Sequence, residues 1–309
     1  MINDDAIVVT NLTKRFNGLV AVDNISFEVK KGELFGFLGP NGAGKTTTIR
    51  MFTGVIKPDS GSASILGYDV VKQGLKTRQL MGIVPEMSNA YVDLSAWSNL
   101  MLVGGLYGVN KSQRSERASS LLKKFSLYER RGQLVKGFSK GMKQKLLLCM
   151  ALISDPQILF LDEPTSGLDV ESQRLIKDII REFNANGTTV FLTTHNMEEA
   201  NQLCDRIAII NHGKIAEIDS PEKVRQQSRG PQTIEVSFDK PVNAENLLKL
   251  SGVKGASKVG DKIRLRVDNT DAAIEALVDY ARSNKLKIIV LNTLAPSLED
   301  VFLQLIKGS

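Results

Sequence analysis

The chain lacks the features of disulfide-bonded, secreted and membrane-spanning proteins. Its 309 residues include only two cysteines, Cys149 and Cys204, which lie far apart in helix-like stretches. We expect both to be buried thiols of a reducing compartment. No apolar run approaches the roughly 20 residues that cross a bilayer, and the first ten residues lack the basic and then apolar layout of a secretory signal. These absences predict a protein of the cytoplasm, or one attached to a membrane from its cytoplasmic side.

Charge and composition restrict the partners further. The chain is 42% hydrophobic, enough for a sizeable core, and its formal net charge is +6. Part of the positive charge suits phosphates, and part is compatible with an anionic membrane surface; a mildly basic solvated surface is the simpler interpretation. The basic residues are scattered and are not interleaved with aromatic residues, so we do not expect nucleic acid as a partner.

One glycine-rich segment carries the strongest signal. Residues 39–46, GPNGAGKT, match the P-loop pattern G-x-x-x-x-G-K-[ST], with an apolar strand predicted before them and a helix after them. The glycines let the backbone curl so that its N–H groups form an anion nest. Lys45 adds a charge for the β- and γ-phosphates, and the Thr46 hydroxyl suits Mg²⁺. The residues expected to bind the nucleotide, ATP, are Gly39, Pro40, Asn41, Gly42, Ala43, Gly44, Lys45, Thr46 and Thr47.

Two carboxylates form the second signal. The apolar run 158–161 is followed by Asp162 and Glu163, as in a Walker B motif. Asp162 is expected to hold Mg²⁺ through water. Glu163 points to the opposite side, where it can polarise a water in line with the γ-phosphate. Such a pair is common by itself, but it is specific downstream of a P-loop and just before residues 164–169, PTSGLD.

The pattern of elements predicts two domains. Residues 94–131 are expected to form helices with polar breaks, and residues 139–153 a helix capped by Ser139. Strands and helices then alternate to residue 210, which predicts a largely parallel sheet with helices on its faces. A polar linker is expected at residues 226–232, between a domain at 1–225 and a smaller one at 233–309. The smaller domain shows a βαββαβ order that fits a ferredoxin-like α+β unit, followed by an amphipathic helix at 296–306. The predicted fold class is therefore α/β with a small α+β domain.

Residues 138–144, FSKGMKQ, resemble the signature motif of ATP-binding-cassette (ABC) ATPases, which is usually LSGGQ. Together with the P-loop, the Walker B motif and residues 166–169, they give a resemblance to this family over residues 6–225. The resemblance implies two cassettes head to tail, with ATP between the P-loop of one and the signature of the other. Ser139 and Gly141 would then contact the nucleotide held by the partner. We expect a homodimer, although a heterodimer would also close the sites.

The resemblance assigns roles to further residues. Phe16 is similar to the aromatic residue that stacks on adenine, with a core aromatic as the alternative. His195 is similar to the histidine that contacts the γ-phosphate, and Asp169 to the aspartate that crosses the dimer interface. The implied catalytic set is Glu163, His195 and Lys45; the implied Mg²⁺ ligands are Thr46, Glu86 and Asp162.

Two departures from the family pattern leave the turnover rate open. Glu86 replaces the usual glutamine and adds negative charge beside the phosphates. Lys140 adds a cation to the signature, either near the partner's γ-phosphate or pointing to solvent. Both departures, together with residues 296–303, PSLEDVFL, resemble the exporter ATPases of drug, polysaccharide and sodium-ion efflux systems.

That narrower resemblance implies a peripheral ATPase subunit at the cytoplasmic face of the membrane, working with an integral membrane transporter subunit. A helix of that subunit would dock in a groove at residues 86–107. The candidate docking residues, which could equally pack against the cassette core, are Tyr91, Leu94, Trp97, Leu100 and Leu102. One alternative function is a soluble ABC ATPase acting on ribosomes or DNA; another is a nucleotide sensor whose C-terminal domain binds a regulatory ligand. The single P-loop and the absence of heptads between Gly39 and Ser139 favour the exporter.

Overall fold

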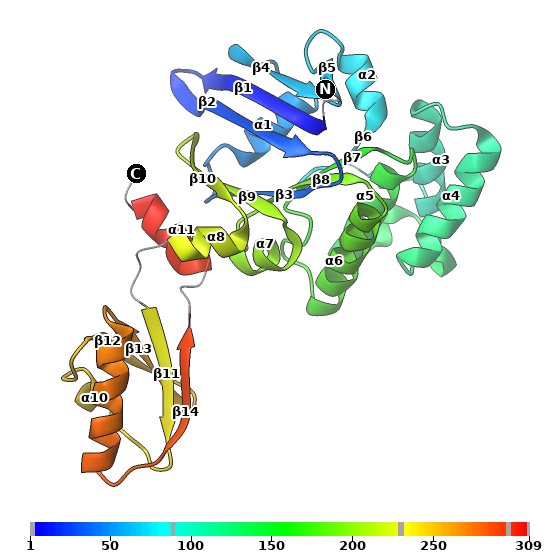
Figure 1. Ribbon diagram of the computed structural model, residues 1–309. Helices are drawn as coiled ribbons and strands as arrows, with labels where there is room; N and C mark the ends of the chain where they lie inside the picture. The colour runs from blue at the N-terminus through cyan, green and yellow to red at the C-terminus, as the bar shows by residue number, and fades with distance from the viewer. Residues whose placement is uncertain (1–3, 88–89, 228–231, 295–297, 308–309) are drawn as a thin grey trace. The chain divides into compact units, whose positions relative to one another are not determined.

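The computed structural model describes residues 4–87, 90–227, 232–294 and 298–307. The chain divides into two compact units, Met1–Ser220 and Pro221–Ser309 (Figure 1). Four residues of the predicted linker, 228–231, lie outside the described residues. Among the described residues, no helix has both the length and the hydropathy that a membrane crossing requires.

The first unit begins with an antiparallel sheet in the strand order β2-β1-β4-β5. Asn17 and Gly18 both have positive φ and form the two-residue turn between β1 and β2, as Asn-Gly favours. This hairpin places Phe16 at its tip, opposite Leu19. The strands are β1 (Asp5–Phe16), β2 (Leu19–Lys30), β4 (Ser60–Ile65) and β5 (Tyr68–Asp69).

The second sheet of this unit has the order β10-β9-β3-β8-β7-β6. Its five consecutive strands from β9 to β6 run parallel, and β10 is antiparallel to β9, which confirms the predicted parallel sheet. Because parallel strands end at one edge, the segments that follow β3, β7 and β8 come together there. The strands are β3 (Leu34–Leu38), β6 (Met81–Val84), β7 (Ile158–Asp162), β8 (Thr189–Thr194), β9 (Arg206–Asn211) and β10 (Lys214–Asp219).

Helices and a core rich in phenylalanine complete the first unit. Phe27 of β2 packs against Phe35, Phe37, Phe52 and Phe191, with ring centroids 5.5 to 6.3 Å apart, so the core lies between the two sheets. The helical region expected at 94–131 is divided into α3, α4 and a 3-10 turn, and α3 and α4 pack against each other and on α5 (Figure 1). The helices are α1 (Lys45–Phe52), α2 (Gly74–Leu80), α3 (Ala96–Leu106), α4 (Lys111–Lys124), η1 (Tyr128–Arg130), η2 (Val135–Gly137), α5 (Lys140–Leu152), α6 (Val170–Ala185) and α7 (Met197–Leu203).

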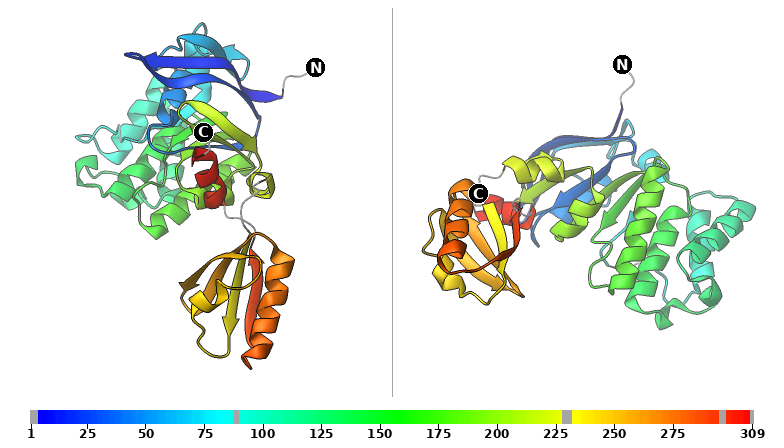
Figure 2. Two further views of the ribbon diagram at one scale, coloured as in Figure 1. Left: turned by 90° about the vertical axis from the view of Figure 1, so that its left-hand side faces the viewer. Right: turned by 60° about the horizontal axis from the view of Figure 1, so that its bottom comes forward.

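The second unit contains an antiparallel sheet in the order β12-β13-β11-β14. This order and the βαββαβ succession confirm the ferredoxin-like prediction. Figure 2 shows α10 along one face of the sheet, and the core behind it includes Ile234, Leu265 and Leu277. The elements are α8 (Pro221–Gln227), β11 (Gln232–Phe238), α9 (Ala244–Leu247), β12 (Val253–Val259), β13 (Lys262–Val267), α10 (Thr270–Ser283), β14 (Ile288–Leu294) and α11 (Leu298–Lys307).

Candidate nucleotide site

The glycine-rich loop runs from the end of β3 to the start of α1. It passes so close to neighbouring backbone that side chains at some of its glycines would clash. Gly44 has φ 112°, in the region that favours glycine. A Cβ on Gly44 would lie 2.5 Å from the carbonyl oxygen of Ala21, and one on Gly39 would lie 2.5 Å from that of Ile210. The glycines are therefore required by the close approach of β2 and β9, as well as by the curl of the loop.

Lys45, the first residue of α1, closes the loop on itself. Its buried Nζ donates to the carbonyl oxygens of Gly39 at 2.7 Å and Pro40 at 3.2 Å. The same ammonium lies 3.5 Å from Oε1 of Glu163. A cation held at this position can exchange carbonyl contacts for phosphate oxygens without leaving the loop.

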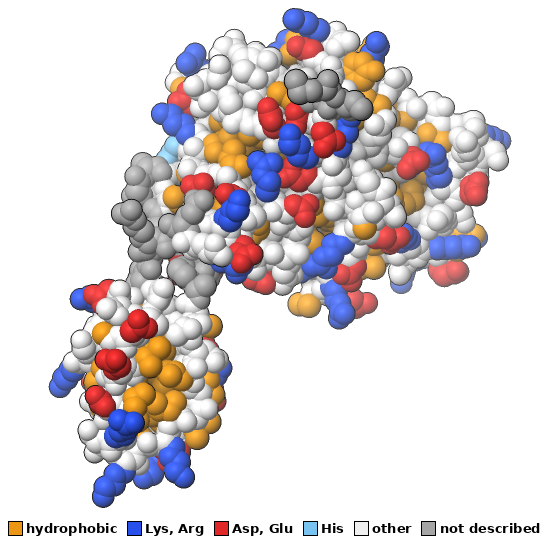
Figure 3. Space-filling model, in the orientation of Figure 1, with side chains coloured by type: hydrophobic (Ala, Val, Ile, Leu, Met, Phe, Trp, Pro, Cys, Tyr) orange, Lys and Arg blue, Asp and Glu red, His pale blue; other side chains and the backbone are white. Residues whose placement is uncertain are grey.

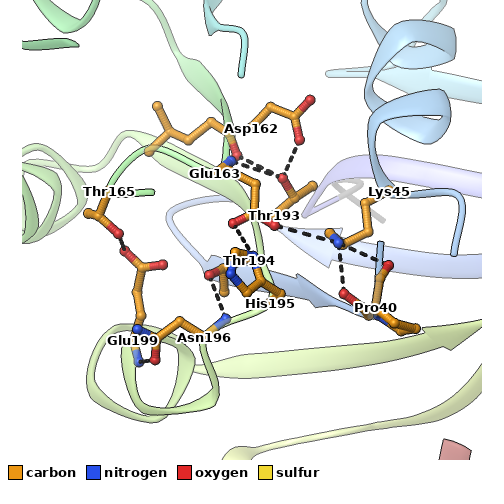
Figure 4. A network of polar contacts seen from close by, with 12 residues as sticks. Pro40, Lys45, Asp162, Glu163, Thr165, Thr193, Thr194, His195, Asn196 and Glu199 are labelled. Carbon is orange, nitrogen blue, oxygen red and sulfur yellow. Dashed lines mark hydrogen bonds and ion pairs between the residues drawn. The ribbon is translucent and has the colours of Figure 1, made fainter. Parts of the chain in front are cut away.

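Glu163 lies at the centre of the polar network in Figure 4, directly after β7. Its Oε2 is 2.8 Å from Nδ1 of His195, and its side chain is only 8% exposed. Its Oε1 has no hydrogen-bond partner among the described residues. A buried carboxylate oxygen without a donor is costly, and a water molecule is the smallest donor that could satisfy it.

Asp162 points away from Glu163, as expected for neighbouring residues of a strand (Figure 4). It is buried, and its Oδ1 accepts from the Thr193 hydroxyl at 2.5 Å. Thr193 also accepts from the backbone N–H of Glu163, at 3.1 Å through its carbonyl oxygen and 3.2 Å through its hydroxyl. The sequence analysis did not predict a role for Thr193. The one sequence feature that marks it is a polar residue at the end of an apolar strand.

A pocket of about 300 Å³ lies over the loop. It brings together the glycine-rich loop, Glu86 and Glu163, as the sequence predicts. The lining residues are Ala21, Asn41, Gly42, Gly44, Lys45, Thr46, Thr47, Glu86 and Glu163. The donor set fits Mg²⁺, since the Thr46 hydroxyl and the Glu86 carboxylate are hard oxygen ligands at the pocket wall. Asp162 is not among the lining residues, and its contact with Mg²⁺ through water stays a prediction.

The predicted signature residues gather elsewhere in the first unit. Ser139 is the N-cap of α5 and accepts from the N–H of Met142 at 3.2 Å, which confirms the predicted cap. Gly141 packs so tightly that a Cβ would lie 2.9 Å from Oγ of Ser172. Asp169 caps α6 through the N–H and hydroxyl of Ser172, and these hydrogen bonds lower the pKa of Asp169. None of Ser139, Gly141 and Asp169 lines the pocket over the P-loop of the same chain.

Burial and contacts place four further residues of the sequence analysis. Phe16 is 44% exposed, so it is not a core aromatic, and Nζ of Lys14 lies 5.4 Å from the centroid of its ring. The Lys140 side chain lies over Gly167, where a Cβ would be 2.4 Å from its Nζ. Cys149 and Cys204 are free and buried, as predicted, and burial raises the pKa of both thiols.

The expected docking groove is only partly correct. Leu100 is fully buried, so of the two alternatives given for it, packing against the core is correct. Tyr91 and Leu102 are exposed, and so is Leu106 nearby at 73%. Leu94 and Trp97 are half-buried. The described part of 86–107 therefore combines packing residues with an exposed apolar surface.

Comparisons with known proteins agree with this architecture. A family model described as ABC transporter matches residues 22–166, and one described as the C-terminal domain of DrrA1-3-like ATP-binding proteins matches residues 219–306. The linearmycin resistance ATP-binding protein LnrL of Bacillus subtilis (strain 168) is 35% identical over 303 residues, covering 96% of each chain. The daunorubicin/doxorubicin resistance ATP-binding protein DrrA of Streptomyces peucetius is 35% identical over 97% of this chain and 92% of its own.

Two further matches extend the comparison. The Nod factor export ATP-binding protein I of Rhizobium sp. (strain N33) is 36% identical over 97% of this chain and 96% of its own. The solved structure of an ATP-binding subunit of an ABC transporter is 30% identical, with a TM-score of 0.68 over 72% of this chain and 92% of that chain. With the P-loop, the Glu163 network and the signature helix in place, the chain belongs to the ABC transporter ATP-binding proteins that carry a DrrA-like C-terminal domain, and it is an ABC-type ATPase.

Proposed function

We propose that this ATPase powers export through a separate membrane-spanning partner, from the cytoplasmic face of the membrane. The observation that carries the catalytic part is Glu163, held between Lys45 and His195 beside the P-loop pocket. The export part is supported by relatives that are named for drug resistance and for Nod factor export.

The proposed chemistry is attack of water on the γ-phosphate of ATP. Oε1 of Glu163, which has no hydrogen-bond partner among the described residues, accepts a hydrogen bond from that water and takes its proton. The new P–O bond forms as the bond between the γ-phosphorus and the bridging oxygen breaks, and ADP leaves. His195 lies 2.8 Å from the other carboxylate oxygen, so it orients the carboxylate when Nδ1 carries the proton. Lys45 stabilises the charge on the transferring phosphoryl group. Thr46, Glu86 and, through water, Asp162 would hold Mg²⁺, which neutralises phosphate charge when bound.

The site is proposed to be completed by a second copy of the chain. Ser139 and Gly141 present the N-terminus of α5, which favours a phosphate, yet neither lines the pocket over the P-loop of its own chain. A solved structure described as a dimeric bacterial ABC transporter cassette is 25% identical, with a TM-score of 0.65 over 69% of this chain and 98% of that chain. A head-to-tail homodimer would place Ser139 of one copy against the ATP of the other.

The membrane partner is proposed to dock on the exposed apolar residues near α3, which are Tyr91, Leu102 and Leu106. A second surface suits anionic lipid headgroups: a groove whose basic residues are Lys57, Lys72, Lys76 and Arg78 and whose described lining contains no Asp or Glu. Val71 and Leu75 also line this groove and are exposed. Figure 3 shows hydrophobic and basic side chains beside each other over α2.

An affinity pull-down tests the exporter proposal. The tagged Glu163→Gln protein is incubated with ATP and detergent-solubilised native membranes. Recovery of a polytopic membrane protein is expected, and the Tyr91→Asp, Leu106→Asp double variant should lose it. Val259→Asp, at an exposed residue of the second unit, serves as the control and should retain it. Recovery of only ribosomes or nucleic acid would overturn the exporter proposal in favour of the alternative.

A further inference from the structure

Glu199 is a buried carboxyl outside the proposed catalytic set. It lies in the first turn of α7 and is 3% exposed. Its Oε1 accepts from the Thr165 hydroxyl at 2.6 Å (Figure 4), and desolvation raises the pKa of Glu199. Burial of a carboxyl is costly unless its hydrogen bonds are retained. The hydrogen bond between Glu199 and Thr165 therefore offsets part of the cost of burying this side chain.

Thr165 belongs to the segment between the carboxylate of Glu163 and the helix cap of Asp169. Gln173 of α6 donates to the carbonyl oxygens of Thr165 at 3.4 Å and Leu168 at 3.0 Å. The side chain of Thr165 is thus held by α7, and its carbonyl by α6. The segment is therefore fixed from two sides.

Glu163 itself has φ 52°, in the left-handed region that a residue with a Cβ rarely adopts. Such a conformation persists only where the surroundings hold it. Its N–H is held by Thr193, and its carbonyl oxygen accepts from the N–H of Ser166 at 3.2 Å. Ser166 directly follows Thr165. A shift of the Thr165 backbone would therefore move the Ser166 N–H that donates to the carbonyl oxygen of Glu163.

The backbone of Glu199 is tied to the loop that carries His195. Its N–H donates to Oδ1 of Asn196 at 3.0 Å, and the N–H of Asn196 donates to the Thr194 hydroxyl at 3.0 Å. One residue therefore links the His195 loop, through its backbone, to the segment following Glu163, through its side chain.

We propose that Glu199 is a positioning residue for ATP hydrolysis: its hydrogen bond to Thr165 keeps Glu163 in its left-handed conformation and in register with His195. The inference rests on the proposed role of Glu163. Glu199 touches neither water nor nucleotide in this role, so its loss affects the hydrolytic step and leaves ATP binding intact.

The test compares steady-state ATP hydrolysis by variants of the full chain. Glu199→Ala should lower kcat by about 10²-fold, the loss expected when a reacting group moves by roughly 1 Å, with KM for ATP unchanged. Glu199→Gln should restore most of the activity, because its amide oxygen still accepts from Thr165. Glu198→Gln is the matched control on the exposed side of the same helix turn and should keep wild-type kcat.

Thr165 gives a second route if Glu199→Ala fails to fold. Thr165→Val removes the hydroxyl at similar volume and should lower kcat, while Thr165→Ser should keep it. Wild-type kcat in both Glu199→Ala and Thr165→Val would overturn the proposal, as would a loss in Glu199→Gln equal to that in Glu199→Ala.

The Glu163→Gln background separates this proposal from the function proposed above. If Glu199 acts through Glu163, Glu199→Ala should cause no further loss in that background. A full additional loss there would overturn the positioning role while leaving the role of Glu163 intact. Conversely, unchanged turnover in the single Glu163→Gln variant would remove Glu163 from the mechanism whatever Glu199→Ala does.

Discussion

Single residues at the mouth of the P-loop pocket decide what chemistry this chain can perform. Glu163 is buried beside Lys45 and His195, and one of its oxygens has no hydrogen-bond partner among the described residues. This oxygen lies 3.5 Å from Nζ of Lys45 but accepts no hydrogen bond, so a water molecule can donate to it without displacing a protein donor. The proposed general base is therefore identified by geometry as well as by its place in the sequence.

The first prediction concerns the charge of Glu163. Glu163→Gln keeps the size of the side chain but cannot accept a proton, so hydrolysis should slow by about 10²- to 10⁴-fold. ATP binding should persist, because the loop that holds the phosphates is unchanged. Phosphate release and equilibrium nucleotide binding measure the two effects, and unchanged turnover would contradict the prediction.

A second prediction concerns Gly44, whose φ and surroundings exclude a side chain. In Gly44→Ala a Cβ would lie 2.5 Å from the carbonyl oxygen of Ala21 at φ 112°. The variant should be destabilised by more than about 1 kcal/mol and should lose nucleotide binding. Gly137→Ala is the control, since nothing lies within 4 Å of its Cβ position. Thermal unfolding and nucleotide binding measure the difference between the two variants. Equal behaviour of the two would contradict the steric argument.

At the scale of elements, helix N-termini and strand ends organise the site. Ser139 caps α5 and Asp169 caps α6, and a Cβ on Gly141 of α5 would lie 3.6 Å from Oδ2 of Asp169, so the N-termini of the two helices lie close together. Ser139 serves a local purpose, since its hydroxyl satisfies an N–H of α5. The proposed contact with the partner's ATP would use the same hydroxyl and the same helix terminus.

A third prediction separates these two uses of Ser139. Ser139→Ala should lower the free energy of unfolding by about 1 kcal/mol through the lost cap. It should also reduce the rise in ATPase rate with protein concentration, which reports dimerisation. Ser139→Asp keeps the cap but places a negative charge beside the partner's phosphates, so it should restore stability without restoring activity. Chemical unfolding and concentration-dependent ATPase rates supply the readouts. Restored activity in Ser139→Asp would argue against the phosphate contact.

A fourth prediction concerns the acid sensitivity of the antiparallel sheet of the second unit, which contains β11 and β13. Hydrogen bonding by Arg264 and Lys262, offset in part by desolvation, lowers the pKa of Glu235 in the folded state. A lowered folded-state pKa means that this stabilisation is present above the unfolded Glu pKa of about 4.3 and is lost as pH falls through the lower folded value. Hydrogen exchange of β11 and β13 should therefore accelerate at acid pH. Glu235→Gln should remove much of this pH dependence; an unchanged profile would contradict the assignment.

At the scale of the whole molecule, we propose that a second copy completes the site. The signature residues Ser139 and Gly141 belong to the same unit as the P-loop but do not line the pocket over it. ATP would then stabilise a dimer, because each γ-phosphate would contact the P-loop of one chain and the signature residues of the other.

A fifth prediction follows for assembly. Glu163→Gln should sediment as a dimer in ATP and as a monomer without it, because hydrolysis no longer opens the interface. Lys45→Ala should remain monomeric under both conditions, since its P-loop cannot retain the nucleotide. Analytical ultracentrifugation distinguishes these states, and an ATP-independent dimer would show that other surfaces, such as those of the second unit, hold the copies together.

The sequence by itself determined the local chemistry: the P-loop, the Asp162-Glu163 pair, the cap at Ser139 and the βαββαβ order of the second unit. These are set by short-range backbone requirements and by hydrophobic periodicity, which are visible along the chain. Only the tertiary structure decided which distant residues meet. It joined Glu199 to Thr165, placed Thr193 between Asp162 and Glu163, buried Leu100 and exposed Phe16. Packing sets such contacts through the register of the parallel strands, and no spacing within one segment encodes that register.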